Sequence, residues 1–327
     1  MFKICLIGCG NHSSRVHGPS LRKYAGLNPQ AVLAACCDMD GSKAAEYSRK
    51  FGFMKYYSDF KKMLDKEKPD AVSIVTPIEA TFNVVSKVMK HGFPVIFEKP
   101  PGKDSGEARE LLSISKQYNI PNRVAFNRRF MPLVRKLKQL MLENIKPGTI
   151  QNIEYHMGRF NRRDPDFSMT AIHGIDVVRY IMDSDYKHVK FFYQEFPELG
   201  HGVANIYMHC IFENGATASI NFCPVSGTTD ERVRIDALDN TFLLHMPFRG
   251  SYDSDGKLVY IQKNCVITDL TGKEVLDGDE PFETSGIYYE NASFFDSLIS
   301  GHNPQEIETT IQSVEVAECI GKRLPEY

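Results

Sequence analysis

The first 126 residues alternate between short apolar runs and stretches with helical periodicity. Short continuous apolar runs are typical of strands that are buried on both faces of a parallel sheet. The alternation predicts six strands, and five of them can be located: Lys3 to Ile7, Ala31 to Cys37, Asp70 to Val75, Val95 to Phe97 and Arg123 to Phe126. Strands that alternate with helices predict an α/β fold with a doubly wound parallel sheet.

Beyond residue 126 the pattern becomes dominated by strands. The Asn214-Gly215 dipeptide lies between two strand-like runs and predicts a β-hairpin. The other elements expected here are helices at 131–144, 170–182, 286–300 and 305–320, and strands at 150–155, 203–212, 216–222, 233–238, 241–246 and 257–263. Together they predict an α+β domain with an open, mostly antiparallel sheet that is covered by helices on one face.

A chain of 327 residues is long enough for two domains with cores of their own. We expect these domains at residues 1–126 and 127–327, with the C-terminal helix packed back on the first domain as an open alternative. The formal net charge of −2 gives no field that would attract nucleic acid or a membrane surface, so neither is an expected partner.

No apolar stretch approaches the roughly 18 residues of a membrane-spanning helix, and the N-terminal run is too short for a signal-peptide core. The eight cysteines form no C-x-x-C pair, which favours buried thiols in a reducing compartment over a disulfide or zinc framework. We therefore expect a cytoplasmic protein.

A glycine-rich turn follows the first strand. Its sequence is G-x-G-x-x-S, with Gly8, Gly10, Asn11, His12 and Ser13, where Ser13 replaces the usual third small residue. Gly8 permits a tight turn, and Gly10 lets a pyrophosphate approach bare backbone, while the next helix offers its free N–H groups to the phosphates. A glycine pattern alone also occurs in plain loops, but this one stands between a strand and a helix, where it predicts a dinucleotide site.

Asp38 ends the second strand. A carboxylate at this position can accept hydrogen bonds from the ribose hydroxyls of an adenosine and repels a 2′-phosphate. No arginine follows Asp38 directly. The sequence therefore predicts NAD in preference to NADP.

The strand Val95 to Phe97 ends on Glu98 and Lys99, which are followed by Pro100 and Pro101. Prolines end the strand and prevent a helix, and ligands of open α/β sheets bind beyond the carboxyl ends of the strands. A lone lysine after a strand is more often just solvated. With a glycine-rich turn upstream and a histidine on a later helix, Lys99 becomes a candidate for chemistry.

Several motifs together resemble the Gfo/Idh/MocA family of nicotinamide-dependent oxidoreductases. They recur in the family's order: Gly8-Cys9-Gly10, Asp38, Thr76-Pro77, Glu98-Lys99-Pro100, Asn127-Arg128-Arg129-Phe130 and His173-Gly174-Ile175-Asp176. The resemblance implies a Rossmann domain, a second domain with an open antiparallel sheet, and hydride transfer to or from a sugar, polyol or nucleotide-sugar. It also implies a homodimer or homotetramer formed through that sheet.

The resemblance carries roles to individual residues. It implies cofactor contacts at Thr76, Pro77, Glu98, Lys99 and Asn127, beside those of the glycine-rich turn and Asp38. For substrate contacts it favours Lys99, His173 and Asp176. Alternation along the strand before that helix makes Tyr155 a further candidate. Oxidation of an alcohol releases a proton that a neutral imidazole can accept, so His173 is the candidate base. The Lys99 ammonium could hold the hydroxyl and stabilise the developing alkoxide.

Two departures from the family's pattern weaken this assignment. Met169 stands one helical turn before His173, where the family usually has an aspartate that orients the imidazole, and a thioether does not do this. Asp164, Asp166 and Thr170 are possible replacements. Thr81 stands where the family often has a histidine, and Ile78 where an asparagine is common.

Two functions therefore remain as hypotheses. The first is an NAD-dependent oxidoreductase that uses Lys99 and His173. The second is a dinucleotide-binding protein of the same fold that has lost turnover and serves as a sensor or an assembly partner. A metal site is not expected, because His12 and His17 have no carboxylate partner at a suitable sequence spacing.

Overall fold

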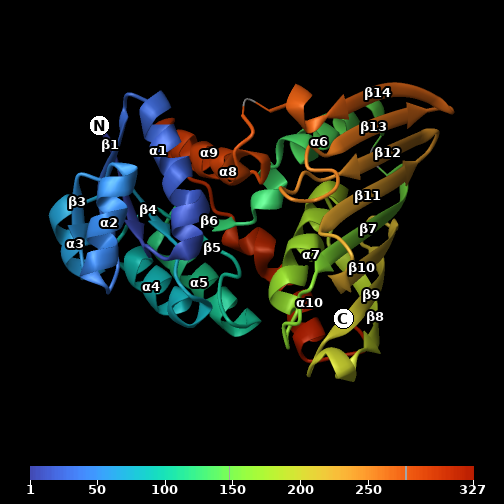
Figure 1. Ribbon diagram of the computed structural model, residues 1–327, viewed down its shortest axis with the longest axis horizontal. Coiled ribbons are helices and arrows are strands. Elements are labelled where there is room, and N and C mark those ends of the chain that lie inside the picture. The colour runs from blue at the N-terminus through green and yellow to red at the C-terminus, as the bar shows by residue number, and fades with distance from the viewer. Residues whose placement is uncertain (147, 277) are drawn as a thin grey trace. The chain divides into compact units, whose positions relative to one another are not determined.

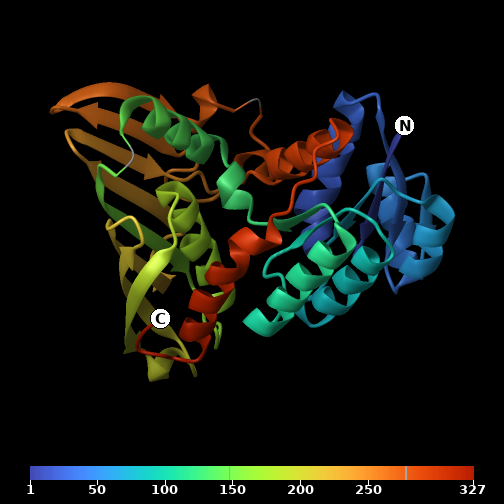
Figure 2. The ribbon, with the colours of Figure 1, turned by 180° about the vertical axis from the view of Figure 1, so that it is seen from behind.

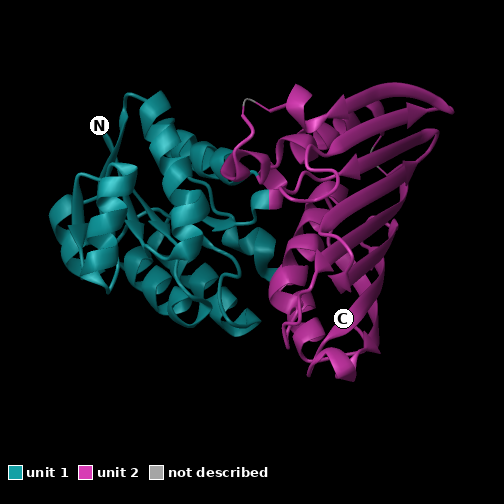
Figure 3. Cartoon of the chain, in the orientation of Figure 1, with its two compact units in different colours: residues 1–127, 286–311 teal, residues 128–285, 312–327 magenta. Residues whose placement is uncertain are grey.

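A computed structural model describes residues 1–146, 148–276 and 278–327. The chain folds into two compact units, which Figure 3 shows in different colours. The first unit comprises residues 1–127 and 286–311, and the second comprises residues 128–285 and 312–327. The first unit thus adds a segment from near the C-terminus to the stretch that the sequence assigned to the dinucleotide-binding domain.

The first unit is built on a parallel sheet of six strands in the order β3-β2-β1-β4-β5-β6 (Figure 1). The strands are β1 (Phe2–Ile7), β2 (Ala31–Cys37), β3 (Lys55–Tyr57), β4 (Ala71–Ile74), β5 (Val95–Glu98) and β6 (Asn122–Ala125). Strands β4 and β6 are buried at every position, as expected for a sheet that is covered on both faces. The predicted doubly wound sheet is confirmed.

Helices connect these strands and cover the sheet. They are α1 (Gly18–Leu27), α2 (Gly41–Phe51), α3 (Phe60–Glu67), α4 (Ile78–Lys90) and α5 (Ser105–Tyr118), with a π-helical segment η1 (Ser13–His17) leading into α1. Asp40, Asp59 and Asp104 cap α2, α3 and α5 by accepting hydrogen bonds from backbone N–H groups of the first turn.

The segment 286–311 contains α9 (Ile287–Ile299) and η5 (Ile307–Thr310) and belongs to the core of the first unit. Phe294 and Phe295 of α9 are fully buried in the same cluster as Ile4 and Leu33 of the first two strands. At the polar end of this contact, the Tyr24 hydroxyl of α1 donates to Asp296 at 2.7 Å. Burial of two phenylalanines explains why so distant a segment completes this unit.

The second unit is built on eight strands in the order β14-β13-β12-β11-β7-β10-β9-β8 (Figure 1). The strands are β7 (Ile150–Phe160), β8 (Tyr186–Glu195), β9 (Ala204–Phe212), β10 (Thr217–Ser226), β11 (Asp230–Ala237), β12 (Asn240–His245), β13 (Lys257–Gln262) and β14 (Cys265–Thr271). All neighbours pair antiparallel except β7 with β10. The predicted mostly antiparallel sheet is confirmed, as is the hairpin at Asn214-Gly215, which joins β9 to β10.

Helices cover one face of this sheet, as the two opposite views of Figures 1 and 2 show. They include α6 (Pro132–Asn144) and α7 (Ser168–Met182), with α8 (Pro281–Thr284) and α10 (Ile311–Gly321) completing the unit. Along β9 and β12, buried residues alternate with partly exposed ones, so each strand presents one side to the helices. The opposite side carries exposed groups such as Phe192, which is 54% exposed.

The sequence pattern missed three strands. β3 has three residues, none of them buried, and so shows no apolar run. β14 is an edge strand with no buried residue, and β8 begins with the alternation Tyr-Lys-His-Val-Lys-Phe, which is weaker than an apolar run. The turn Lys263-Asn264 between β13 and β14 has positive φ at both residues, as two-residue hairpins favour, but Lys-Asn is not one of the dipeptides that signal such a turn in a sequence.

No helix among the described residues is long and apolar enough to cross a membrane.

Gly8 is required by the packing of the first unit. Its φ is +102°, and a Cβ atom at this position would lie 2.0 Å from the carbonyl oxygen of Val75 at the end of β4. Gly26 in α1 has open space around it. We expect Gly8→Ala to lower the free energy of unfolding by roughly 2–4 kcal/mol, because backbone strain and overpacking add.

Gly26→Ala is the matched control and should leave stability unchanged or raise it by up to about 1 kcal/mol, because alanine favours helix. Urea unfolding of both variants followed by circular dichroism makes the measurement. Equal stability of Gly8→Ala and wild type would contradict the close approach of the glycine-rich turn to β4.

Candidate active site

The carboxyl ends of the strands in the first unit bring most of the predicted cofactor residues to one edge. β1 lies between β2 and β4, so the chain order reverses at β1 and β4, where open α/β sheets bind their ligands. The turn after β1, Asp38 after β2, Thr76 after β4, Glu98 and Lys99 at the end of β5, and Asn127 after β6 all follow these ends. The sequence could predict this grouping because parallel strands end at the same edge.

The glycine-rich turn is held against the end of β2. The Gly8 N–H donates to the carbonyl of Cys37 at 2.8 Å, and the Cys9 N–H donates to Oδ2 of Asp38 at 2.9 Å. The other oxygen of Asp38 accepts from the Asp40 N–H at 3.0 Å. Asp38 thus fixes the turn in addition to the ribose-binding role that the sequence predicts.

Gly10, Asn11 and His12 form the outer part of this turn and are exposed. A Cβ atom on Gly10 would meet no heavy atom within 4 Å, so the space above this residue is open. Ser13 differs from them, because its side chain is fully buried and its hydroxyl lies 2.8 Å from the hydroxyl of Tyr47. The third small residue therefore serves the packing of the first helix on α2, and the Ser13 side chain is not among the groups that face the open space.

Glu98 is the most connected carboxylate at this edge. Its Oε1 lies 2.7 Å from Nε2 of His17 and 3.2 Å from Nε2 of His12, and its Oε2 accepts from the Lys99 N–H at 3.2 Å. Burial raises the pKa of Glu98, but the hydrogen bonds and charges of the two histidines outweigh burial and hold that pKa well below its ordinary value. Glu98 is therefore ionised at neutral pH.

The carboxylate partner of the two histidines thus comes from a distant strand, which the sequence spacing did not reveal. The three groups could hold a metal ion, since one ligand atom from each lies within 4.8 Å of the others. Two histidines and a glutamate are a donor set that zinc uses. Metal-bound histidines usually donate their second ring nitrogen to an acceptor, whereas the buried Nδ1 of His17 has no hydrogen-bond partner among the described residues.

Thr81, at the position where the family often has histidine, is buried in the first turns of α4. Its hydroxyl lies 3.1 Å from the hydroxyl of Thr76 and donates to the carbonyl of Pro77 at 3.1 Å. Thr81 thus supports the segment Thr76-Pro77 from within the unit. It is an internal support, and no proton-transfer role follows from its position.

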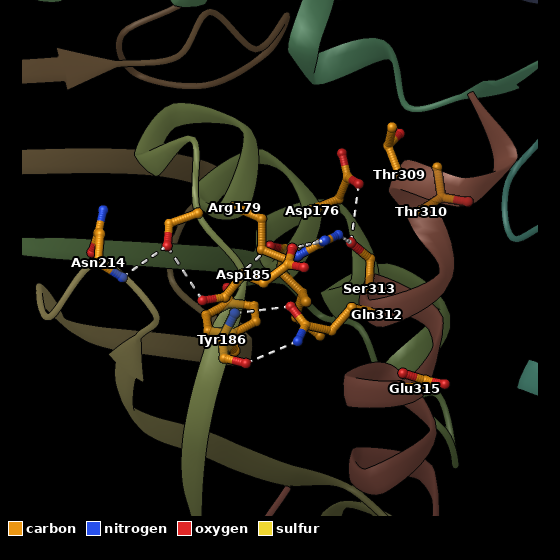
Figure 4. Close-up of polar contacts among 12 residues, drawn as sticks. Asp176, Arg179, Asp185, Tyr186, Asn214, Thr309, Thr310, Gln312, Ser313 and Glu315 are labelled. Atoms are coloured by element: carbon orange, nitrogen blue, oxygen red, sulfur yellow. Dashed lines mark hydrogen bonds and ion pairs between the residues drawn. The ribbon is translucent and has the colours of Figure 1, made fainter. Parts of the chain in front are cut away.

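In the second unit, α7 carries His173 and Asp176 on one helical face. Asp176 is 1% exposed and receives a two-point contact from Arg129, whose Nε and NH2 atoms lie 2.7 and 2.6 Å from its oxygens. The Ser313 hydroxyl of α10 also donates to Asp176, at 3.1 Å, and in turn accepts from Arg179 (Figure 4). Asp176 is therefore the centre of a hydrogen-bonded group that joins α7 to α10.

The three groups that the sequence offered in place of an aspartate at Met169 all have other partners. Asp164 pairs with Arg162 at 2.8 Å, and the Thr170 hydroxyl accepts from Arg162 at 3.3 Å. Asp166 accepts from the Ser168 N–H at 2.8 Å at the start of α7. Their contacts serve the loop before α7 and the start of that helix.

Tyr155 lies inside the second unit, where it is 1% exposed. Its hydroxyl donates at 2.6 Å to Glu231, a fully buried carboxylate that also pairs with Arg128 and Arg159. Burial and the neighbouring carboxylate raise the pKa of Tyr155 well above its ordinary value. The structure thus gives Tyr155 a partner within the core, which differs from the predicted role as a substrate contact.

The buried group of Arg128, Arg159, Tyr155 and Glu231 was not predicted from the sequence. Burial raises the pKa of Glu231, but the charges of Arg128 and Arg159 outweigh it and lower that pKa to about 2. Only the pairing of β7 with β11 brings Glu231 beside Tyr155 and Arg159. The strands expected from the sequence ended at residue 155 and began at residue 233, so Arg159 and Glu231 lay outside them and nothing in the pattern signalled a buried charge.

The sequence of this chain matches the model of a family described as the oxidoreductase family with an NAD-binding Rossmann fold, over residues 2–126. An uncharacterized oxidoreductase of Bacillus subtilis, YrbE, is 26% identical over 211 residues, which are 59% of this chain and 60% of that protein. A myo-inositol 2-dehydrogenase of Thermotoga maritima is 26% identical over 200 residues, 57% of each protein. The matched segments span between 42% and 60% of the length of the first curated relatives.

The fold extends over the whole chain in solved structures. That of a levoglucosan dehydrogenase in complex with NADH superposes with a TM-score of 0.83 at 19% identity and covers 100% of this chain and 98% of its own. The predicted resemblance is therefore confirmed: residues 2–126 match the Rossmann-fold model of the Gfo/Idh/MocA oxidoreductase family, and the fold of the whole chain is shared with solved structures.

The buried group around Glu231 generates a prediction for stability. Glu231→Gln leaves two buried arginines without their carboxylate, so we expect it to lower the free energy of unfolding at pH 7 by roughly 3–5 kcal/mol. Because the pKa of Glu231 is lowered on folding from its ordinary 4.5 to about 2, its stabilising effect is present above pH 4.5 and is lost as the pH falls towards 2.

The difference in stability between wild type and Glu231→Gln should therefore shrink below pH 4.5, as measured by thermal unfolding from pH 3 to pH 7. Glu154→Gln is the control, because Glu154 lies exposed on the adjacent strand β7. A stability difference that stays constant over this pH range would contradict the assigned role of Glu231.

Proposed function

We propose that this protein is an NAD-dependent oxidoreductase that transfers a hydride between NAD(H) and a hydroxyl or carbonyl group of a sugar, polyol or nucleotide-sugar. The observation that carries the proposal is the grouping of an open glycine turn, Asp38, Glu98 and Lys99 at one edge of the first sheet. In this proposal residues 1–126 bind the dinucleotide, and residues 127–327 bind the substrate and mediate oligomerisation.

The residues at the edge of the sheet fit a dinucleotide. Backbone without a Cβ at Gly10 and open space above it suit a pyrophosphate, and the helix that begins after the turn presents an N-terminus with no side-chain cap, which favours an anion. The Asp38 carboxylate is fixed by two backbone N–H groups and still has lone pairs for ribose hydroxyls. Asn11, His12, Thr76, Pro77, Glu98 and Asn127 complete the proposed contacts.

Bound NAD supplies the hydride acceptor, and the chain supplies orientation and proton transfer. His173 is the proposed base that takes the proton of the substrate hydroxyl, since a neutral imidazole accepts a proton near pH 7. Lys99, which follows β5 directly, is proposed to hold the substrate hydroxyl and to stabilise negative charge as it develops. Asp176 already binds Arg129 and Ser313, so its main role in this proposal is to fix α7. Any contact of Asp176 with the substrate is made in addition to these two.

A small carbohydrate-like molecule is the proposed substrate, because relatives of similar sequence include a myo-inositol 2-dehydrogenase and a D-glucoside 3-dehydrogenase. The helix-free face of the second sheet, with the exposed Phe192, is the proposed contact surface of a homodimer or homotetramer. A cytoplasmic location is proposed from the cysteine composition, since all eight cysteines are free thiols here.

Met169 favours a second candidate, a dinucleotide-binding protein without turnover. The contacts of Asp164, Asp166 and Thr170 support this alternative, because each of these groups is engaged by the loop before α7 or by the start of that helix. The first sheet and its glycine turn are the same in both candidates, so cofactor binding does not distinguish them. Only a measurement of turnover separates the two candidates.

Cofactor preference provides the first test of the proposed function. Wild type should bind NADH at least tenfold more tightly than NADPH, because the Asp38 carboxylate repels a 2′-phosphate. Asp38→Asn should reduce that preference, with the control Asp59→Asn, a helix-capping carboxylate at an exposed position, leaving it unchanged. Isothermal titration calorimetry is the measurement, since the chain has no tryptophan to report binding by fluorescence. Tighter binding of NADPH would refute the assignment of Asp38.

Turnover tests the two candidates. Screening polyols, sugars and nucleotide-sugars with NAD⁺ by NADH absorbance should reveal a substrate, and Lys99→Ala or His173→Ala should then lower kcat by about 100-fold or more. Lys103→Ala is the control, because Lys103 pairs with Glu107 on the surface. Unchanged kcat in Lys99→Ala would show that the active site lies elsewhere.

Met169→Asp probes the two candidates further, measured as kcat on any substrate found. A large gain in turnover would favour the second candidate, in which catalysis has decayed with the loss of the aspartate. No gain would indicate that another group already orients His173.

A further inference from the structure

His17 has no role in the function proposed above, yet it makes the shortest contact with Glu98. We propose that His17 is a positioning residue: through Glu98 it fixes the backbone at Lys99 and links the helix of the glycine-rich turn to the end of β5. This inference rests on the proposed function for the role of Lys99, but the link itself lies within the first unit and exists without it.

The π-helical segment Ser13–His17 makes the link possible. In a regular α-helix with 3.6 residues per turn, His12 and His17 would lie about 140° apart around the axis. A π-turn pairs residues i and i+5, which brings these two side chains to the same side of the helix. Their rings are 5.4 Å apart, and both Nε2 atoms reach the same oxygen of Glu98. Single π-turns of this kind are frequent at functional sites.

The two histidines differ in their surroundings. The side chain of His17 is 3% exposed and lies 2.7 Å from Oε1 of Glu98, whereas that of His12 is 60% exposed and lies 3.2 Å from the same atom. The buried Nδ1 of His17 has no hydrogen-bond partner in the described parts of the chain, so the contact with Glu98 is the polar anchor of this ring. A buried charge-assisted hydrogen bond stabilises far more than an exposed one, which makes His17 the dominant partner.

Glu98, held in place by His17, in turn fixes the backbone of Lys99. While Oε1 contacts the histidines, Oε2 accepts from the Lys99 N–H at 3.2 Å, so one carboxylate bridges the first helix and the last peptide before Pro100. Without His17, a largely buried carboxylate would lose its main donor and would turn towards water. The Lys99 backbone would then lose its fixed acceptor, and the direction of the Lys99 side chain would no longer be set.

This arrangement has a consequence for the proposed reaction. The glycine turn that would hold the phosphates and the strand end that carries Lys99 are joined by a single carboxylate. Errors of about 1 Å in the placement of a catalytic group are costly for rate. Loss of His17 should therefore affect kcat much more than the affinity for NADH, because the phosphate-binding turn keeps its own contacts with Asp38 and Cys37.

The first test needs no substrate. Hydrogen–deuterium exchange followed by mass spectrometry compares the peptides that cover residues 10–17 and 95–99 in wild type, His17→Leu and His17→Gln. We expect His17→Leu to speed exchange in both segments by tenfold or more and His17→Gln, whose amide can donate to Glu98, to stay within about threefold of wild type. His91→Leu is the control, since His91 is exposed at the end of α4. Unchanged exchange at 95–99 in His17→Leu would overturn the proposal.

The second test distinguishes positioning from general support of the fold. On any substrate found, His17→Leu should lower kcat at least tenfold and weaken the binding of NADH by a smaller factor, and His17→Gln should recover most of the loss in kcat. Because His17 acts through Glu98, the double variant His17→Leu/Glu98→Gln should be no slower than Glu98→Gln alone. Additive losses in the double variant would overturn the proposal.

Two further outcomes are informative. Faster exchange in His17→Leu combined with no turnover by wild type on the screened substrates would support the link between the helix and β5 independently of the proposed enzyme. The second outcome comes from titration of the protein with Zn²⁺ alone, which measures metal binding. Submicromolar binding that is lost in both His12→Asn and Glu98→Gln would identify a metal site and overturn the positioning role.

Discussion

The structure depends on the close contact between the glycine-rich turn and its two flanking strands. β1 pairs with both β2 and β4, and its last residue is followed by Gly8, whose missing side chain lets the turn touch the end of β4. Asp38 then anchors the turn to β2. Because three parallel strands end together here, the groups that follow them lie at the same edge, and the candidate cofactor residues of the first unit gather there.

Carboxylates organise both units, but in different ways. At the edge of the first sheet, Asp38 and Glu98 accept from backbone N–H groups and so fix the positions of loops. In the second unit, Glu231 and Asp176 each bind arginine inside the protein. Buried ion pairs of this kind contribute little net stability relative to apolar packing, but removing one partner is strongly destabilising. Their hydrogen bonds join β7 to β11 and α7 to α10.

The candidate site was only partly visible in the sequence. Gly8, Gly10, Asp38 and Glu98 could be recognised because each stands next to a strand end, and strand ends can be located from apolar runs. Ser13 fitted the same pattern, yet its hydroxyl contacts Tyr47 in the interior. The pairing of His17 with Glu98 spans 81 positions along the chain and depends on a π-turn. No local pattern of residues predicts a contact between positions so far apart in the sequence.

The sequence by itself determined the doubly wound sheet, the mostly antiparallel second sheet and the order of the motifs, because apolar periodicity and glycine turns act locally. Tertiary structure alone decided which strands form the edges, as with β3 and β14, whose residues are not buried and leave no apolar signal. It also decided that Phe294 and Phe295 complete the first core and that Tyr155 faces Glu231. Those outcomes depend on which surfaces meet in space, because the apolar area removed from water, and with it the free energy of burial, is set by that contact.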